Sequence, residues 1–202
     1  MTPINIRQPH STAGIALLMT MMVLGVVLAV TLAIVELSLQ QLALSVDSKD
    51  SEIAFHAANA GLECARYTRR HASSSFDKGN AVIFNCFGTT QSVTKASLGT
   101  VTAVKGVKDF VYRYTTDVDW GAGVDRCSSI DLITMIVSTT SNADVSITAP
   151  SGLDTVFPGY PTASKTCAPG AVCTIAAVAG YNAACSAKDG AGVLKRQVLL
   201  EF

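Results

Sequence analysis

A run of uncharged residues from Ile15 to Val35 constrains this chain more than any other feature. As an α-helix the run would be about 31 Å long, close to the thickness of the hydrocarbon core of a bilayer. It is longer than the apolar centre of a secretory signal peptide, which has about 7–15 residues, and no cleavage site of small residues follows it. We therefore expect a transmembrane helix over 15–35 that continues beyond the membrane.

The helical pattern extends past this run to Arg70. No proline occurs between Ile15 and Arg70. Apolar or small residues recur at helical spacing along the second half, at Leu39, Leu42, Val46, Ile53, Ala57, Ala60 and Cys64. Cations gather at the end, where they favour the helix dipole. The pattern predicts one stalk helix over 15–70, about 84 Å long, whose amphipathic second half packs on a sheet.

The remaining residues, 71–202, are expected to form a β-rich head. After Asn80 the chain is rich in Thr, Ser, Val, Gly and Ala, and its charges are spaced singly. Strands are expected at Ala81–Phe87, Val101–Lys105, Asp109–Thr116, Ile130–Thr140, Ala143–Thr148, Thr174–Tyr181 and Val193–Phe202. The row Phe110, Tyr112 and Tyr114 is a sheet's core face more often than an adhesive surface. The fold class is therefore α+β, a long N-terminal helix packed on a C-terminal antiparallel sheet.

The distribution of charge indicates the orientation in the membrane. Arg7 and His10 precede the apolar run without any acid. Acids dominate the segment after it: Glu36, Asp47, Asp50 and Glu52, against the single cation Lys49. Because positive residues stay on the cytoplasmic side, the N-terminus is expected inside and the head outside. The net charge of zero and the charged fraction of 15% give no electrostatic reason to expect nucleic acid as a partner.

The six cysteines all follow the apolar run: Cys64, Cys86, Cys127, Cys167, Cys173 and Cys185. An even number on one side of a membrane span favours disulfides over six reduced, buried thiols. Fifteen pairings are possible. Cys64 with Cys86 would join stalk to head, and the Pro-Gly turn between Cys167 and Cys173 favours that pair. Cys127 and Cys185 then remain, and no pairing is decided at this point.

A catalytic or metal-dependent role finds no support in the sequence. There is no C-x-x-C motif, and His10, His56 and His71 are not clustered with cysteines at ligand spacing. His56 and Cys64 are eight positions apart on one helix, too far for a nucleophile and its base. We therefore expect no metal, no cofactor and no enzymatic activity.

Gly14, Ile15 and the helix that follows resemble the type IV pilin and pseudopilin family. The short leader over 1–14 carries a basic residue and ends at Gly14, directly before the uncharged helix. The segment EIAFHAANAGLECAR, over 52–66, is similar to the Ala-rich helix of PilX-like minor pilins. The resemblance implies cleavage by a prepilin peptidase after Gly14 and N-methylation of Ile15. It also implies partners: other pilin subunits through the N-terminal helix, the inner-membrane assembly platform and the membrane itself.

Two positions depart from the family pattern. Major subunits carry Glu at the fifth position after the cut, where this chain has Met19, and the first position is Ile15 rather than Met or an aromatic residue. A buried carboxylate is costly unless a neighbour's cation pairs with it. A subunit at a filament tip has no neighbour above it, so the missing acid favours a minor or tip-proximal subunit.

The function expected from the sequence is structural. The chain would be a subunit of a type IV pilus or related filament, inserted in the cytoplasmic membrane and later displayed on the cell surface. Two alternatives stay open: a K-type tip pseudopilin of a type II secretion system, and a single-pass membrane-anchored extracellular binding domain.

Overall fold

The computed structural model describes residues 13–98, 102–104, 110–121, 123–138, 145–148 and 153–202. It contains a long N-terminal helix and a C-terminal antiparallel sheet, so the predicted α+β class is confirmed at this level. The chain forms two units, an N-terminal unit (Met1–Asp47) and a C-terminal unit (Ser48–Phe202), which we describe separately. Most of the predicted leader, 1–12, lies outside the described residues.

Helix α1 runs from Ala13 to His71, in agreement with the predicted helix over 15–70. No proline interrupts it, and Arg69, Arg70 and His71 occupy its last turn, where their charges favour the helix dipole. A second helix, α2 (Ser73–Lys78), follows at once and was not predicted. It ends at Gly79, whose φ of 66° is the left-handed conformation that glycine adopts readily.

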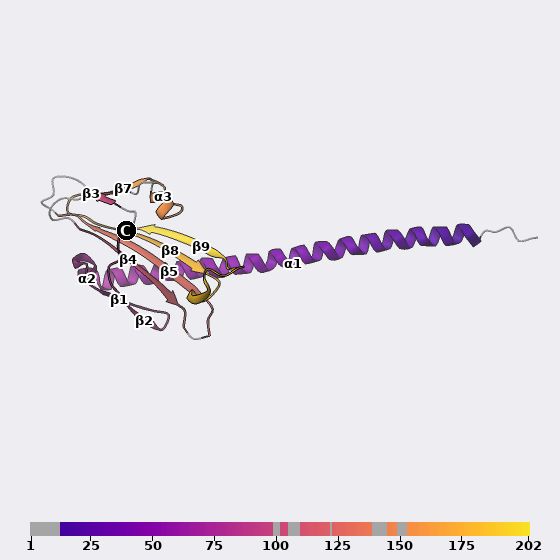
Figure 1. The fold of residues 1–202 in the computed structure, drawn as a ribbon, viewed down its shortest axis with the longest axis horizontal. Coiled ribbons are helices and arrows are strands. Elements are labelled where there is room, and N and C mark those ends of the chain that lie inside the picture. The colour runs from indigo at the N-terminus through magenta and orange to yellow at the C-terminus, as the bar shows by residue number, and fades with distance from the viewer. Residues whose placement is uncertain (1–12, 99–101, 105–109, 122, 139–144, 149–152) are drawn as a thin grey trace, which may run out of the picture. The chain divides into compact units, whose positions relative to one another are not determined.

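Four strands form the central sheet of the C-terminal unit, in the order β4, β5, β8, β9 (Figure 1). Their bounds are Phe110–Asp119, Cys127–Ile136, Val172–Tyr181 and Lys195–Glu201. Every neighbouring pair is antiparallel. These strands correspond to the expected segments, although β5 and β8 begin earlier than the sequence suggested.

One face of this sheet packs against the Ser48–His71 segment of α1, together with α2 and the hairpin of β1 (Val82–Cys86) and β2 (Thr89–Val93). Tyr114, Ile130 and Leu132 of the sheet are buried there with Phe76 of α2 and Phe84 of β1. Phe76 meets the Tyr114 ring edge to face, with centroids 4.8 Å apart. The expected aromatic row is split, because Tyr114 is fully buried whereas Phe110 remains 43% exposed.

Helix and sheet approach closely because two glycines lie where they cross. A Cβ on Gly180 of β8 would lie 2.1 Å from the Ala54 carbonyl oxygen and 2.2 Å from the Ala58 nitrogen. A Cβ on Gly61 of α1 would lie 2.7 Å from Cβ of Ser128. The buried side of α1 is accordingly made of small residues, chiefly Ala54, Ala57, Ala58 and Ala65. The face predicted from hydropathy shared only Ala57 and Cys64 with the residues that are buried.

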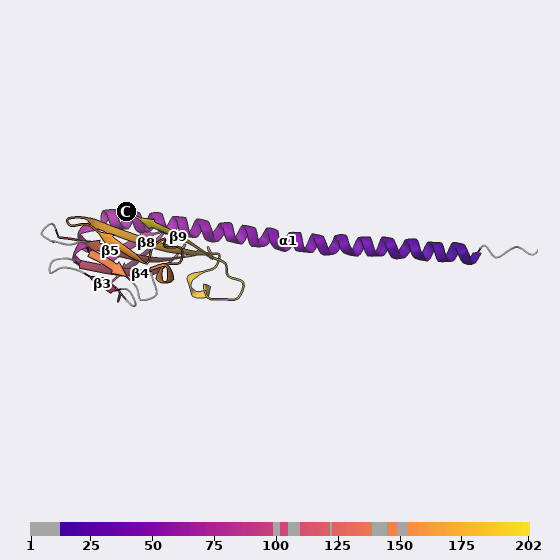
Figure 2. The same cartoon turned by 90° about the horizontal axis from the view of Figure 1, so that it is seen from above.

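The opposite face of the four-stranded sheet, which we call the outer face, is partly covered by a smaller layer (Figure 2). This layer contains β3 (Thr102–Val104), β6 (Val145–Thr148), β7 (Ser164–Cys167) and the short helix α3 (Leu153–Val156). Ile147, Leu153 and Phe157 pack there against Ile133 and Ile175 of the sheet. Several ends of the expected strands, at 101, 105, 109, 139–140 and 143–144, lie outside the described residues.

Candidate functional site

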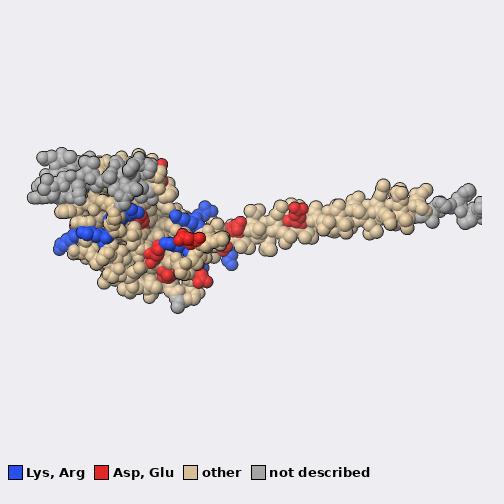
Figure 3. All heavy atoms as spheres, viewed as in Figure 1, with Lys and Arg blue, Asp and Glu red and all other residues tan. Residues whose placement is uncertain are grey.

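The first candidate surface is the apolar segment of α1 within the N-terminal unit. Its large apolar side chains are all exposed: the first, Ile15, is 65% exposed and the last, Val46, is 51% exposed. In Figure 3 this segment has no Lys, Arg, Asp or Glu over most of its length, whereas the surface of the C-terminal unit carries both basic and acidic side chains. The helix is long and apolar enough to cross a membrane, by length and composition. Each Å² of this apolar area that is exposed to water costs about 25 cal/mol, and lipid or neighbouring helices would remove that cost.

The two hydroxyl groups inside the apolar run are satisfied within the helix. Thr20 donates to the Leu17 carbonyl and Thr31 to the Leu28 carbonyl, each over 2.8 Å. Such bonds let a hydroxyl lie in an apolar medium without an unpaired group. Gly25, between them, has no atom within 4 Å of where a Cβ would be, so this helix face is open to a close neighbour.

The residues of the predicted cleavage site lie at the start of α1. Gly14 is exposed, with nothing within 4 Å of its Cβ position, and Ile15 follows as the first large exposed side chain. Met19, which replaces the family's acid, is 60% exposed. Glu36 is exposed and forms no ion pair with any residue that the structure describes. These placements leave Gly14 sterically accessible.

Three disulfides cross-link the C-terminal unit. They join the two cysteine pairs that the sequence analysis considered and the two cysteines that it left over. Cys64–Cys86 joins α1 to β1, Cys127–Cys185 joins β5 to the 3₁₀ turn at Cys185–Ala187, and Cys167–Cys173 joins β7 to β8. No cysteine is a free thiol. Cys64 therefore offers no nucleophile to His56, which instead pairs with Glu52 at 3.5 Å.

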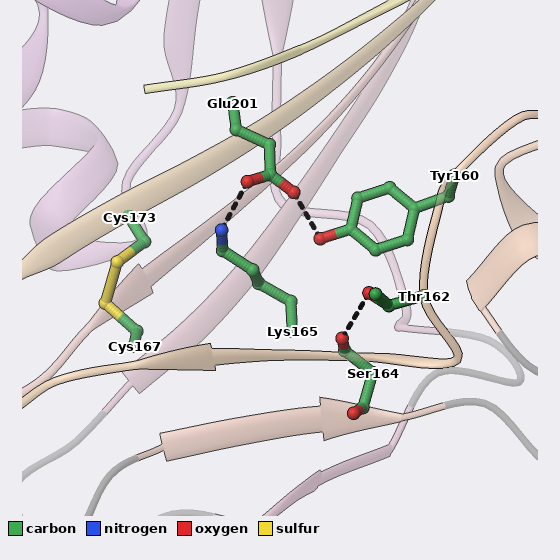
Figure 4. A network of polar contacts seen from close by, with 7 residues as sticks. All are labelled: Tyr160, Thr162, Ser164, Lys165, Cys167, Cys173 and Glu201. Atoms are coloured by element: carbon green, nitrogen blue, oxygen red, sulfur yellow. Dashed lines mark hydrogen bonds and ion pairs between the residues drawn. A yellow bond between two sulfur atoms is a disulfide. The ribbon is translucent and has the colours of Figure 1, made fainter.

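A polar cluster reinforces the contact between the small outer layer and the four-stranded sheet (Figure 4). The carboxylate of Glu201 on β9 accepts hydrogen bonds from the Tyr160 hydroxyl and the Lys165 ammonium, the latter on β7 beside the Cys167–Cys173 disulfide. Burial alone would raise the pKa of Glu201, but the bonds from Lys165 and Tyr160 and the charge of Lys165 lower it. Burial and the bond to Glu201 raise the pKa of Tyr160, which therefore stays protonated as the donor.

This cluster predicts a loss of stability in acid. Folding lowers the pKa of the Glu201 carboxyl from its ordinary value of about 4.5. The contribution of this carboxylate to the free energy of unfolding is therefore complete above pH 4.5 and is lost as the pH falls through the lowered pKa. Its side chain is 35% exposed, so we expect the contribution to be below about 1 kcal/mol. Urea unfolding of wild type and Glu201→Gln at pH 7 and pH 3 checks this. Wild type should lose more stability than the variant, and equal losses would contradict the role of Glu201.

No catalytic arrangement is evident in the part of the chain that the structure describes. Within it, no three His, Cys, Asp or Glu residues come together as a metal site. The charged residues of the outer face pair with one another: Lys188 with Asp117, and Arg113 with Asp131 over 2.9 Å from its Nε. The hydrogen bond and charge of Asp117 raise the pKa of Lys188 despite its partial burial. These four residues are therefore engaged with one another across the outer face.

The structure adds a second candidate surface that the sequence did not indicate. Two adjoining hollows, of about 620 Å³ and about 250 Å³, meet at Ser129 on the uncovered part of the outer face, and the larger one is also lined by β2 and the chain after it, beside the edge strand β4. No local pattern marked them, because the lining residues come from five strands, β2, β4, β5, β8 and β9, and from the segments after β2, at α3 and at Lys188.

Comparisons with family models, with curated proteins and with solved structures find no match.

Proposed function

We propose that this chain is a structural subunit of a type IV pilus or related filament, in a minor or tip-proximal position. One observation carries the proposal: an uncharged, exposed helical segment begins directly after Gly14 and belongs to the same helix that packs on a disulfide-linked antiparallel sheet. A lipid-embedded helix of this kind can exchange lipid for the flanks of equivalent helices, with little change in apolar burial. The polar C-terminal unit then faces the exterior, where an oxidising environment maintains its disulfides.

Processing after Gly14 tests the proposal. In a host with a prepilin peptidase and assembly platform, the mature chain should begin at Ile15 with a methylated amine, and Gly14→Asp should block cleavage. Intact mass and N-terminal peptide analysis by mass spectrometry give the answer. Gly25→Ala, which alters a glycine of the same helix away from the cut, should be processed like wild type. A mature wild-type chain that retains residues 1–14 would contradict the proposal.

Two alternatives are separated by where the chain is found. Immunogold labelling along isolated filaments, or only at their ends, supports the pilus subunit. Recovery solely in a small complex with other subunits of a secretion system supports the K-type tip pseudopilin, which the missing acid at Met19 also suits. A chain that stays in the membrane without an assembly ATPase, unprocessed, is a single-pass anchored binding domain.

A further inference from the structure

The uncovered part of the outer face is shaped as a trough that crosses the strands. One row of residues, in register across the four strands, makes its floor: Asp117, Ser129, Ala179 and Gln197. The central strands contribute the small side chains of Ser129 and Ala179, whereas the edge strands contribute the longer Asp117 and Gln197. A sheet with small residues in its middle and long ones at its edges is hollow there, and the two hollows meet at Ser129.

The two ends of the trough are built by different elements. At the β4 end, Lys188 forms an ion pair with Asp117, and the chain after β2 supplies Thr94 and Ala96 to the lining. At the β9 end, the Gln197 amide approaches the Pro158 carbonyl at 3.5 Å, and Phe157 and Pro158 close the smaller hollow. The trough is therefore elongated, with walls at both ends of a continuous floor.

Its lining suits a ligand that is rich in hydroxyl groups. Donors and acceptors come from hydroxyl and amide side chains, including Gln91, Ser92, Thr115, Ser129 and Gln197. Both acids of the lining are engaged in ion pairs, Asp117 with Lys188 and Asp131 with Arg113. The exposed ammonium groups of Lys95 and Lys195 lie 5.5 Å and 6.0 Å from the ring centroids of Tyr112 and Tyr181. A ligand that bound one of the four ion-paired residues through its charge would have to break that pair and leave a partly buried partner without its counter-charge.

From this register, lining and charge pairing we propose that the trough binds a neutral oligosaccharide. The chain of sugar rings lies across the strands, over Ser129 and Ala179, with its hydroxyls bonded to the edge residues. The proposal concerns the C-terminal unit alone and does not depend on the chain being a filament subunit.

The experiment uses the full-length chain in detergent micelles and an array of neutral oligosaccharides, acidic oligosaccharides and extended peptides. A neutral oligosaccharide is expected to bind, and its affinity is then measured by titration calorimetry. Ser129→Arg places a long side chain in the middle of the trough and should weaken binding at least tenfold. Ser74→Arg, an exposed position on α2 away from the outer face, is the matched control and should bind as wild type does.

A milder variant keeps the test decisive if Ser129→Arg does not fold. Gln197→Ala removes one edge hydrogen bond, worth about 1 kcal/mol, and should weaken binding about fivefold. Circular dichroism establishes that each variant is folded. The proposal is overturned if no neutral oligosaccharide binds, if only acidic sugars or peptides bind, or if the folded trough variants bind as tightly as Ser74→Arg.

Discussion

Gly180→Ala is expected to destabilise the C-terminal unit by about 3 kcal/mol or more, at the upper end of the usual cost of overpacking. The added methyl group would lie 2.1 Å from the carbonyl oxygen of Ala54 and 2.2 Å from the nitrogen of Ala58. Both are backbone atoms of α1, so no side-chain rotation relieves the overlap and helix and sheet must separate. Gly180→Val should prevent folding.

A series of glycine substitutions separates this effect from general loss of flexibility. Gly61→Ala meets side-chain atoms of Ser128 and Val178 and should cost less than Gly180→Ala, whereas Gly25→Ala meets nothing. Urea unfolding, followed by fluorescence of the single tryptophan, Trp120, measures all three. This ring is a suitable reporter because it stacks on Phe87 and donates to the hydroxyl of Ser128, which in turn bonds the Ala57 carbonyl. Equal free energies of unfolding for Gly180→Ala and Gly25→Ala would show that α1 and β8 do not approach as closely as described.

Removal of the Cys127–Cys185 disulfide is expected to cost about 4 kcal/mol, the largest effect among the three bridges. This bridge closes the longest loop, with a sequence separation of 58, against 22 for Cys64–Cys86 and 6 for Cys167–Cys173. Because a longer closed loop removes more conformational entropy from the unfolded chain, the other two should contribute about 3 and about 2 kcal/mol.

The series is measured by replacing both cysteines of each pair with alanine and comparing the free energies of unfolding. Each variant serves as a control for the others, since every one removes two sulfurs and leaves two bridges intact. Equal losses for the longest and the shortest loop would rule out loop closure as the main source of stabilisation. The remaining explanation would be the packing of the sulfurs, of which Cys127 is the more buried partner in its pair.

The errors of the sequence analysis have particular physical causes. Strands β2 and β7 were missed because they are short and polar, with the sequences TTQSV and SKTC. Helix α2 was missed because its three serines resemble a helix end, whereas in the structure Phe76 is fully buried against Phe84 and Tyr114 and holds that helical turn in place. The buried face of α1 was predicted at the wrong positions. The close contact between α1 and the sheet selects small side chains, and hydropathy distinguishes such residues only weakly from polar ones.

The sequence alone determined the long helix, since apolar residues without proline favour that conformation through bonds between residues only four apart. It also located the segments that form β4, β5, β8 and β9, because their alternating or apolar character is local, but not their grouping into one sheet. The contacts between distant segments could be read only from the folded chain: Gly180 lies against Ala54, and Asp117, Ser129, Ala179 and Gln197 form one row across the sheet. These contacts depend on the strand register and on where the helix crosses the sheet. Both are set by packing between segments that are far apart in the chain, so a local sequence pattern does not predict them.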